Sequence, residues 1–255
     1  MSSMPEEYTS IVGEAVIAHL RQLAAQLKGM RVVHVNSTRE GGGVAEILNW
    51  LVPFKQELGL DVRWEVVSGE ASFYQCTKGF HNALQGSPVA ITPALLRAYE
   101  QTNRENAERL RPVLEEADFV FIHDPQPAPL LGLCPNRRGK WIWRCHIDLS
   151  RPYRPVWKYL RDFVAGYDAS IWSLADFAQP LPHPLYLIAP SIDPLSQKNR
   201  ELYPGEVDAV FDRYGLNPDL PLITQISRFD RFKDPLGVIQ AYRLVKAFTP
   251  VQLVL

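Results

Sequence analysis

The chain has 255 residues, with 27 Lys and Arg against 28 Asp and Glu and a net charge of -1. This balance excludes the broad basic surface with which many proteins bind nucleic acid or anionic membranes. The start lacks a signal-peptide pattern and no apolar run reaches membrane-spanning length, so we expect a cytoplasmic globular protein. Cys76, Cys134 and Cys145 are odd in number and lack C-x-x-C spacing, which predicts reduced, packed thiols.

The first seventy residues alternate between the apolar periods of helices and strands. They predict, in order, a helix at 11–28, a strand at 31–36, a helix at 44–58 and a strand at 62–67. We expect the first helix to end before Gly29, and Pro53 to kink the second helix or end it early. The glycines 41–43 separate the first strand from the helix that follows it.

The middle of the chain continues this alternation. Pro93, at a first helical position, begins a predicted long helix that runs to Leu114. Strands are predicted at 119–122, 141–145, 169–172 and 185–188, with a helix at 150–164 between the middle two. Strands that alternate with helices are typical of a parallel sheet covered on both faces. The sequence therefore predicts an α/β domain, Rossmann-like, over residues 1–190.

A proline-rich stretch at 191–205 is the predicted linker to a second domain. Beyond it the sequence predicts a helix at 206–214, a strand at 222–226, a helix at 235–247 and a strand at 251–255. These elements are too few for a doubly wound sheet, which usually has about five or six strands. We therefore expect residues 206–255 to be a partial, truncated nucleotide-sugar-binding domain.

The glycine loop lies between a predicted strand and a helix. Glycines let the backbone approach a ligand, and the amino terminus of a helix offers unpaired N–H groups to negative charge. A dinucleotide-binding fingerprint requires a glycine where this chain has Glu46, which disfavours a dinucleotide-dependent oxidoreductase. We interpret Gly41, Gly42 and Gly43 as substrate-binding candidates, with a tight turn that holds no ligand as the alternative.

A second candidate site follows the predicted strand at 222–226. Arg228 and Lys233 come from the carboxyl end of that strand, where open α/β sheets bind ligands. A guanidinium and an ammonium group suit a diphosphate that gains negative charge as a glycosidic bond breaks. The alternative is a solvated surface loop in which these cations pair with Asp230 and Asp234.

Two further segments place polar side chains at strand ends. His146 and Asp148 follow one predicted strand, and Asp124 follows another, after His123. A histidine can donate to a sugar hydroxyl, and carboxylates can accept from hydroxyls or orient a histidine. We interpret the remaining histidines as structural: His19, His34, His81 and His183. Because no spacing matches a zinc motif, we expect no metal.

Five segments together resemble one known family. They are HVNSTREGGGVAEIL (34–48), HDPQP (123–127), RCHIDLS (144–150), APSIDPLSQKN (189–199) and SRFDRFKDPLGVIQAYRLVK (227–246). In this order they resemble the trehalose-forming retaining glycosyltransferases, called trehalose synthases or trehalose glycosyltransferring synthases. The resemblance extends to Leu255 and implies two Rossmann-like domains of the GT-B type, the second truncated.

The resemblance also implies a reaction. Glucose would move from a nucleoside diphosphate glucose to free glucose, giving trehalose with retained configuration, and the reaction would run in reverse. His146 would contact the donor glucose, Arg228 and Lys233 would hold the diphosphate, and the glycine loop would lie near the phosphates and the acceptor. The leaving phosphate would help to deprotonate the acceptor, so no protein nucleophile, cofactor or metal would be required.

The family's glutamate-containing donor loop would lie beyond the equivalent of Leu255, so this chain is expected to be an inactive fragment. Its expected partners are nucleoside diphosphate glucose and glucose or trehalose, without nucleic acid or membrane, and self-association into a homo-oligomer is expected. Two alternatives remain open. One is a related GT-B transferase with another acceptor, of the sucrose-phosphate or glycogen type, and the other is a non-catalytic sugar- or nucleotide-binding module.

Overall fold

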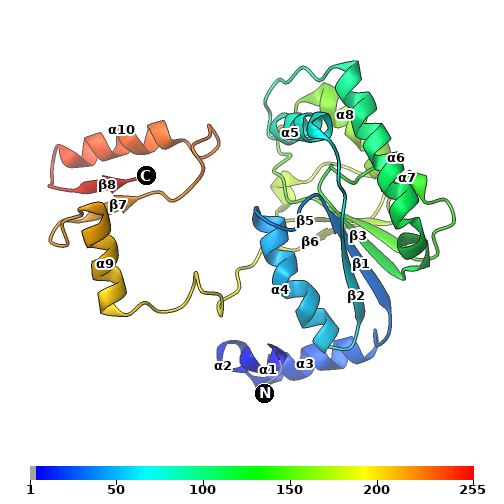
Figure 1. The fold of residues 1–255 in the computed structure, drawn as a ribbon, viewed down its shortest axis with the longest axis horizontal. Helices are drawn as coiled ribbons and strands as arrows, with labels where there is room; N and C mark the ends of the chain where they lie inside the picture. Colours follow the sequence, from blue (N-terminus) through cyan, green and yellow to red (C-terminus); the bar gives the residue numbers. More distant parts are fainter. Residues whose placement is uncertain (1–3) are drawn as a thin grey trace. The chain divides into compact units, whose positions relative to one another are not determined.

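The structure, a computed structural model, describes residues 4–255 (Figure 1). Contacts divide the chain into two compact units, one that runs up to Asp193 and one at Pro194–Leu255. The first unit contains α1 (Met4–Glu7), α2 (Thr9–Val12), α3 (Glu14–Ala25), β1 (Arg31–Asn36), α4 (Gly43–Glu57), β2 (Asp61–Val66), α5 (Ala71–Leu84), α6 (Pro93–Glu116), β3 (Phe119–His123), α7 (Leu130–Leu133), β4 (Lys140–Arg144), α8 (Arg154–Val164), β5 (Ala169–Trp172), the short 3-10 helix η1 (Ala175–Phe177) and β6 (Leu185–Leu187). The second contains α9 (Pro204–Tyr214), β7 (Leu222–Thr224), α10 (Pro235–Lys246) and β8 (Gln252–Val254).

The sheet of the first unit has six strands in the order β2-β1-β3-β4-β5-β6, and every neighbouring pair is parallel. The strand order reverses between β1 and β3, because β2 lies on one side of β1 and β3 lies on the other. In open parallel sheets, ligands bind outside the carboxyl ends of the strands at such a reversal. Here β1 leads into the glycine loop and β3 leads into Asp124.

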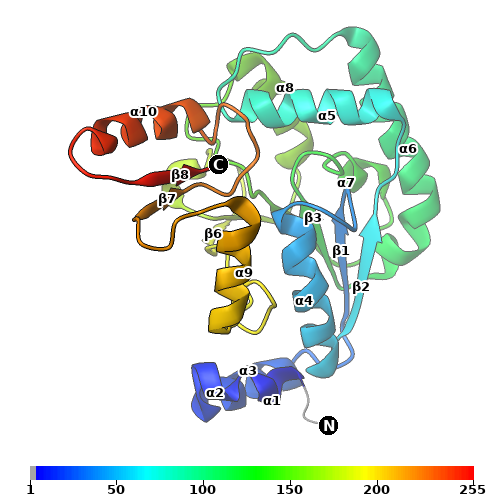
Figure 2. The same ribbon diagram turned by 60° about the vertical axis from the view of Figure 1, so that its left-hand side comes forward.

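Each face of this sheet has its own apolar core. Val33 and Val35 of β1 belong to the core that α5, α6 and α8 cover. Val32, one residue away, packs with Leu48 of α4 on the opposite face. Figures 1 and 2 show α4 on one side of β1 and β2 and α6 on the other. The alternation follows from the two-residue period of a strand, and it places His34 on the α4 face.

Most elements lie within a few residues of their predicted positions. The helix predicted at 11–28 is present as α3 at Glu14–Ala25, but its predicted start is wrong, because Gly13 adopts a φ of 83° and separates α2 from α3. Pro53 lies inside α4, which continues to Glu57, so this proline does not end the helix early. The segment 71–84, for which no element was predicted, forms α5 and buries its apolar side.

The second unit is a small sheet with two helices. Its strands are parallel, with Leu222 opposite Gln252, and each is shorter than predicted. Among the described residues from 194 onward, only Val251 is buried. Asp234 caps α10 by accepting from the N–H of Gly237 at 3.1 Å. Backbone hydrogen bonds and helix caps therefore hold this unit, with little apolar core.

The three cysteines are free and buried, as the sequence predicted. Desolvation raises the pKa of Cys76 to about 12 and is the main cause that raises the pKa of Cys134 to about 11. Both are therefore neutral thiols at neutral pH. Within residues 4–255, no helix is both long enough and apolar enough to cross a membrane.

Candidate active site

Three histidine rings form a line that starts inside β1 and ends after β4. His34 Nδ1 lies 3.0 Å from His123 Nε2, and His123 Nδ1 lies 3.0 Å from His146 Nε2. Lys55 of α4 extends the line at its other end, where its Nζ lies 3.1 Å from His34 Nε2. His34 and His123 are buried, and His146 is partly exposed. A continuous chain of hydrogen bonds, the histidine line, thus connects α4 with the predicted site residue His146.

Burial sets the charge of these groups. Desolvation is the main cause that lowers the pKa of each of the three imidazoles. The charge of Lys55 lowers the pKa of His34 further, whereas the carboxylate of Asp124 opposes the shift at His146. Desolvation also lowers the pKa of Lys55 to about 8. At neutral pH the three rings are therefore neutral and end on an ammonium group.

A cavity of about 660 Å³ lies against the histidine line. Its polar residues include His34, Lys55, His123, Arg144 and His146. Apolar side chains of α3 and α4 supply much of the remaining wall. Arg144 donates from Nη2 to the carbonyl of Ile188 at 2.6 Å, while its Nη1 is buried without a hydrogen-bond partner in the described structure. An apolar cavity with a few convergent polar groups is typical of a small-molecule site.

The predicted residues Asp124 and Asp148 both lie in the loops that surround His146. Asp124 Oδ1 accepts a hydrogen bond from the backbone N–H of His146 at 2.7 Å. Asp148 Oδ1 accepts from the N–H of Ser150 at 2.7 Å and so shapes the turn after His146. The structure therefore brings three predicted residues together, and it gives each carboxylate a local positioning contact.

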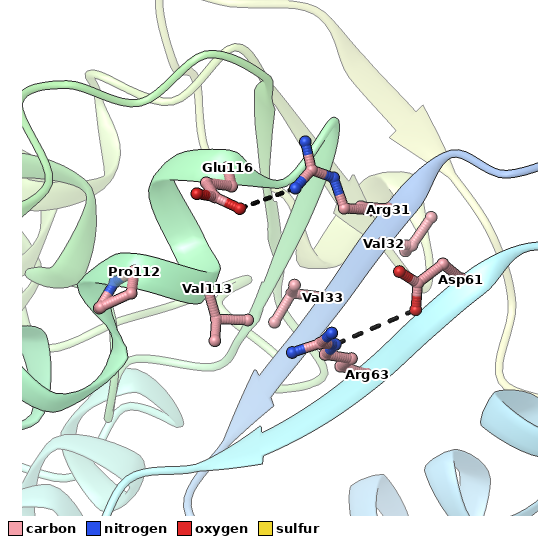
Figure 3. Close-up of a pocket in the computed structure, with 8 residues that line it drawn as sticks. All are labelled: Arg31, Val32, Val33, Asp61, Arg63, Pro112, Val113 and Glu116. Atoms are coloured by element: carbon pink, nitrogen blue, oxygen red, sulfur yellow. Dashed lines mark hydrogen bonds and ion pairs between the residues drawn. The ribbon is translucent and has the colours of Figure 1, made fainter.

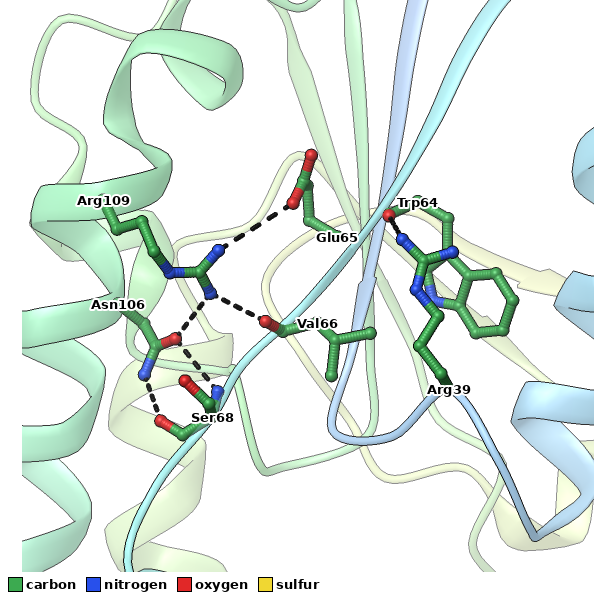
Figure 4. Close-up of polar contacts among 7 residues, drawn as sticks. All are labelled: Arg39, Trp64, Glu65, Val66, Ser68, Asn106 and Arg109. Carbon is green, nitrogen blue, oxygen red and sulfur yellow. Dashed lines mark hydrogen bonds and ion pairs between the residues drawn. The ribbon is translucent and has the colours of Figure 1, made fainter.

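The glycine loop is fixed at its start by a stacked arginine (Figure 4). The Arg39 guanidinium donates to the carbonyl of Trp64 and lies 4.4 Å from the centre of the Trp64 ring. Trp64 Nε1 donates to Asn36 Oδ1 at 2.9 Å, at the end of β1. Gly41 and Gly42 follow with φ values of 72° and 81° and with open space around them. The loop backbone is therefore accessible, between an anchored start and the amino terminus of α4.

The far side of β2 is held by α6, as Figure 4 also shows. Arg109 donates to the carbonyl of Val66 at 2.7 Å and to Asn106 Oδ1 at 2.9 Å. Asn106 in turn donates to the carbonyl of Ser68 at 2.7 Å and accepts from its N–H at 3.0 Å. The strand that carries Trp64 is thus fixed from both sides, which stabilises the anchor of the glycine loop.

Arg228 and Lys233 lie in the loop between β7 and α10 of the second unit. Arg228 pairs with Asp230 at 3.1 Å, and its side chain is 77% exposed. Lys233 is also exposed, and its backbone N–H donates to the carbonyl of Asp230 at 3.1 Å. The ion pair given as the alternative is therefore present for Arg228, while both cationic side chains remain accessible to an anion.

A second cavity, of about 240 Å³, lies at the amino ends of β1 and β2 (Figure 3). Its arginines have carboxylate partners: Arg31 lies 2.8 Å from Glu116, and Arg63 lies 4.0 Å from Asp61. Ligand sites of open parallel sheets lie at the opposite, carboxyl ends. We therefore place the candidate site at the histidine line and not in this cavity.

The histidine line has a geometry unlike that of a metal site. Within the described residues 4–255, no group of three or more His, Cys, Asp or Glu side chains is arranged to hold a metal ion. His34, His123 and His146 direct their ring nitrogens at one another along a line. A metal would require nitrogen lone pairs that converge on one point.

Comparison with known proteins identifies the family. Residues 34–179, which include the glycine loop and the histidine line, match the model for the trehalose synthase N-terminal domain. The chain belongs to this family. The trehalose synthase of Pyrococcus horikoshii is 45% identical over 254 residues, which are 98% of this chain and 60% of that protein. The chain thus spans about 60% of the length of this trehalose synthase relative.

Solved structures show the fold. An α,α-trehalose-phosphate synthase from Burkholderia vietnamiensis aligns with a TM-score of 0.62 at 15% identity, over 89% of this chain and 63% of that chain. A structure from E. coli described as trehalose-6-phosphate bound with UDP-2-fluoro glucose aligns with a TM-score of 0.59 at 14% identity, over 88% of this chain and 63% of that chain. The predicted GT-B type of α/β fold is confirmed.

Sequence reasoning named His146 as a candidate and did not name Lys55 or His34 as one, although the structure connects both to it through His123. It interpreted His34 as structural, whereas the structure places this ring between Lys55 and His123 and against the cavity. One signal was available in the sequence: His34 interrupts a run of valines on a predicted strand. The structure adds that its register partner on β3 is Phe121, two residues before His123. Residues two apart on a strand share a face.

Proposed function

We propose that the protein is a retaining hexosyltransferase that moves glucose from a nucleoside diphosphate glucose to glucose and so forms trehalose, and that it catalyses the reverse reaction. Membership of the trehalose synthase family supports the chemistry. The observation that carries the proposal is the line of neutral imidazoles that ends at His146, beside the reversal of strand order where such sheets bind ligands.

Each candidate residue has a role in this proposal. His146 donates a hydrogen bond to a hydroxyl of the donor glucose, and Asp124 holds the backbone of His146. Gly41, Gly42 and Gly43 present backbone N–H groups to the phosphates and the acceptor, and Asp148 shapes the loop that contacts the sugar. Arg228 and Lys233 bind the diphosphate, which their exposure and charge support.

The chemical step requires no protein nucleophile. The bond from the anomeric carbon to the diphosphate oxygen breaks, a bond from the same face to the anomeric hydroxyl oxygen of the acceptor forms, and the hydroxyl proton passes to the leaving diphosphate. In this proposal Asp124 has a positioning role, through the hydrogen bond that its Oδ1 accepts from the backbone N–H of His146. No cofactor or metal takes part. The E. coli structure of the same fold, which holds UDP-2-fluoro glucose, supports a nucleotide-sugar donor.

We propose that the 255-residue chain alone binds ligand and does not transfer glucose. Its second unit has one buried residue among those described, Val251, and Arg228 is 77% exposed, so this unit does not enclose a donor. Binding without turnover is the behaviour of the non-catalytic module left open by the sequence.

The test compares the natural full-length protein with the 255-residue chain. Each is incubated with UDP-, ADP- or GDP-glucose and labelled glucose, and the products are separated by chromatography. We expect trehalose from the full-length protein and none from the 255-residue chain. Hydrolysis alone contradicts the transferase assignment, and a product formed only with fructose 6-phosphate or a glucan favours a related transferase with another acceptor. Trehalose formed by the 255-residue chain contradicts the binding-only proposal.

A further inference from the structure

We propose that Lys55 is a positioning residue that sets, through His34 and His123, which ring nitrogen of His146 carries its proton. The ring-nitrogen geometry of the histidine line carries this inference. It rests on the proposed function only for the hydrogen bond between His146 Nδ1, the ring nitrogen outside the line, and a sugar hydroxyl. Lys55 lies on α4 and His146 follows β4, so the influence passes through two intervening rings.

An ammonium group imposes one direction on the line. Protonated Lys55 has donors only, so His34 Nε2 must accept from it and His34 must carry its proton on Nδ1. That N–H donates to His123 Nε2, and His123 Nδ1–H then donates to His146 Nε2. A neutral imidazole has one N–H, so the proton of His146 resides on Nδ1. The His146 end of the line therefore offers a hydrogen-bond donor, Nδ1–H.

A neutral amine removes this constraint, because it accepts a hydrogen bond as well as donating one. The reverse arrangement then becomes available, in which every ring carries its proton on Nε2 and His146 Nδ1 is an acceptor. Mixed arrangements are disfavoured. They would place two N–H groups or two lone pairs against each other across 3.0 Å, at the cost of a hydrogen bond in a buried site. The three rings therefore change together.

The ring geometry fits this transmission. The planes of His123 and His146 differ by 16°, and those of His34 and His123 by 32°, with centroids 5.3 Å apart in both pairs. If the facing nitrogens lie on the line between two ring centres, the centre-to-centre distance is the nitrogen–nitrogen distance of 3.0 Å plus about one ring width. The distance of 5.3 Å matches this, so neighbouring rings meet edge to edge. Such rings direct an N–H along the lone pair of the next ring. Phe121 packs against the inner end of the histidine line: its ring centre lies 4.8 Å from the ring centre of His34 and 5.0 Å from Lys55 Nζ.

Lys55 is suited to the role because desolvation lowers its pKa to about 8. Other charged or titratable groups act on the same set of rings. Arg144 of β4 lowers the pKa of His123 and His146, and Asp124 raises the pKa of His146. The remaining titratable groups that line the cavity are Tyr8, Glu46 and Asp193. Of the charged residues, Lys55 hydrogen-bonds the inner end of the line directly.

The test is nuclear magnetic resonance of the 15N-labelled 255-residue chain, in which two-bond 1H–15N spectra report the tautomer of each of its six histidines. At pH 6.5 we expect His34, His123 and His146 to carry their protons on Nδ1. As the pH rises through about 8, their Nδ1–H fractions should fall together with a single midpoint. Different tautomers among the three rings at pH 6.5, or three separate midpoints, would overturn the proposal.

Two substitutions give opposite results if the proposal holds. Lys55→Arg keeps a permanent donor, so the Nδ1–H tautomers should persist to pH 10. Lys55→Met removes the donor, so the preference should be lost already at pH 6.5. Lys158→Met, at an exposed position of α8, is the matched control and should behave as wild type. A wild-type midpoint in Lys55→Arg would overturn the proposal even if Lys55→Met failed to fold.

The tautomer measurement needs no turnover, so it separates this proposal from the proposed function. In the natural full-length protein, kcat/KM for trehalose formation should fall about tenfold in Lys55→Met, the effect of one hydrogen bond, and Lys55→Arg should restore it. Coupled tautomers without trehalose formation contradict the proposed function alone. Trehalose formation with independent tautomers contradicts the role of Lys55 alone.

Discussion

Asp124 and His146 are joined by a hydrogen bond of 2.7 Å from the backbone N–H of His146 to Asp124 Oδ1. Asp124 reaches this position with a φ of 61°, a left-handed conformation that L residues other than Asn and Asp rarely adopt. Its own N–H donates to the carbonyl of Arg144 at 2.9 Å, and its carbonyl accepts from Trp143 Nε1 at 3.0 Å. One residue in a left-handed conformation thus joins the ends of β3 and β4 and holds the backbone of His146.

Asp124→Ala should therefore lower the free energy of unfolding by about 1–3 kcal/mol, because it removes the acceptor and places alanine at a positive φ. Asp124→Asn keeps a carbonyl oxygen and tolerates this φ, so its loss should stay below about 1 kcal/mol. Urea unfolding followed by tryptophan fluorescence measures both. Equal losses in the two variants would contradict the role given to the hydrogen bond and the backbone conformation.

Lys55 should make stability depend on pH in the alkaline range. Its pKa is 10.5 in the unfolded chain and about 8 in the folded chain, so the unfolded chain binds more protons between these values. The contribution of Lys55 is therefore fully present above pH 10.5 and is lost as the pH falls through 8. The difference between the two pKa values corresponds to about 3 kcal/mol.

Other groups titrate in the same range, so the experiment compares two profiles. Burial raises the pKa of Tyr99 and of Cys145. Because their charged forms are disfavoured in the folded chain, the contribution of these two groups to the free energy of unfolding falls as the pH rises. The profile of Lys55→Met contains these effects without that of Lys55, so the difference between the two free energies of unfolding isolates the lysine. We expect wild type to gain relative to Lys55→Met from pH 8 to 10.5. A flat difference would show that Lys55 is not desolvated.

The buried thiols should react only when the chain opens. Cys76, Cys134 and Cys145 are buried, and desolvation raises the pKa of each, so both access and thiolate formation are suppressed. With Ellman's reagent, the native chain should react at least about a thousandfold more slowly than the chain in urea, which corresponds to an opening free energy of about 4 kcal/mol. Thr249→Cys adds a thiol at an exposed position and should react at once. Rapid reaction of a native cysteine would contradict this packing.

The sequence predicted the strands well because β1 and β3 are rich in β-branched and aromatic residues, and it placed the start of α6 because Thr92 and Pro93 form a clear cap. It did not separate α2 from α3, since a glycine such as Gly13 is tolerated within a helical pattern. The domain boundaries at 190 and 206 and the roles of the site residues remain predictions.

The histidine line was beyond sequence reasoning for a different reason. Periodicity reports which face a side chain occupies, and it does not report which strand lies next to it. His34 and His123 are 89 residues apart, and they meet only because β1 pairs with β3 in one particular register. Lys55 completes the line from α4, across a tertiary contact that no local pattern encodes.

The exposed cations of the second unit should matter for turnover and not for folding. In the natural full-length protein, Arg228→Ala or Lys233→Ala should lower kcat about 30- to 1000-fold, because losing a charge-assisted contact to a developing anion costs about 2–4 kcal/mol. Both side chains are exposed, so the unfolding midpoint should be unchanged. Arg243→Ala, exposed in the last turn of α10, is the control. Near wild-type kcat in both variants would contradict diphosphate binding by Arg228 and Lys233 and would favour the alternative of a solvated surface loop.

Apolar exposure in the second unit predicts self-association of the 255-residue chain. Ile226, Phe229 and Phe248 are 83%, 73% and 91% exposed. The sheet has two strands, so β7 and β8 each have a backbone edge that no described strand covers. Apolar surface and open strand edges both promote pairing with other chains.

We expect size-exclusion chromatography with light scattering to give a mass above that of one chain, which rises with protein concentration. Ile226→Ser with Phe248→Ser should lower the mass toward that of one chain, because the two changes remove the most exposed apolar side chains of the unit. Leu23→Ser, at a 46% exposed position of α3, removes a similar side chain from the first unit and should leave the mass unchanged. A single-chain mass at every concentration would contradict association, whereas a fall in mass with Leu23→Ser alone would place the contact on the first unit.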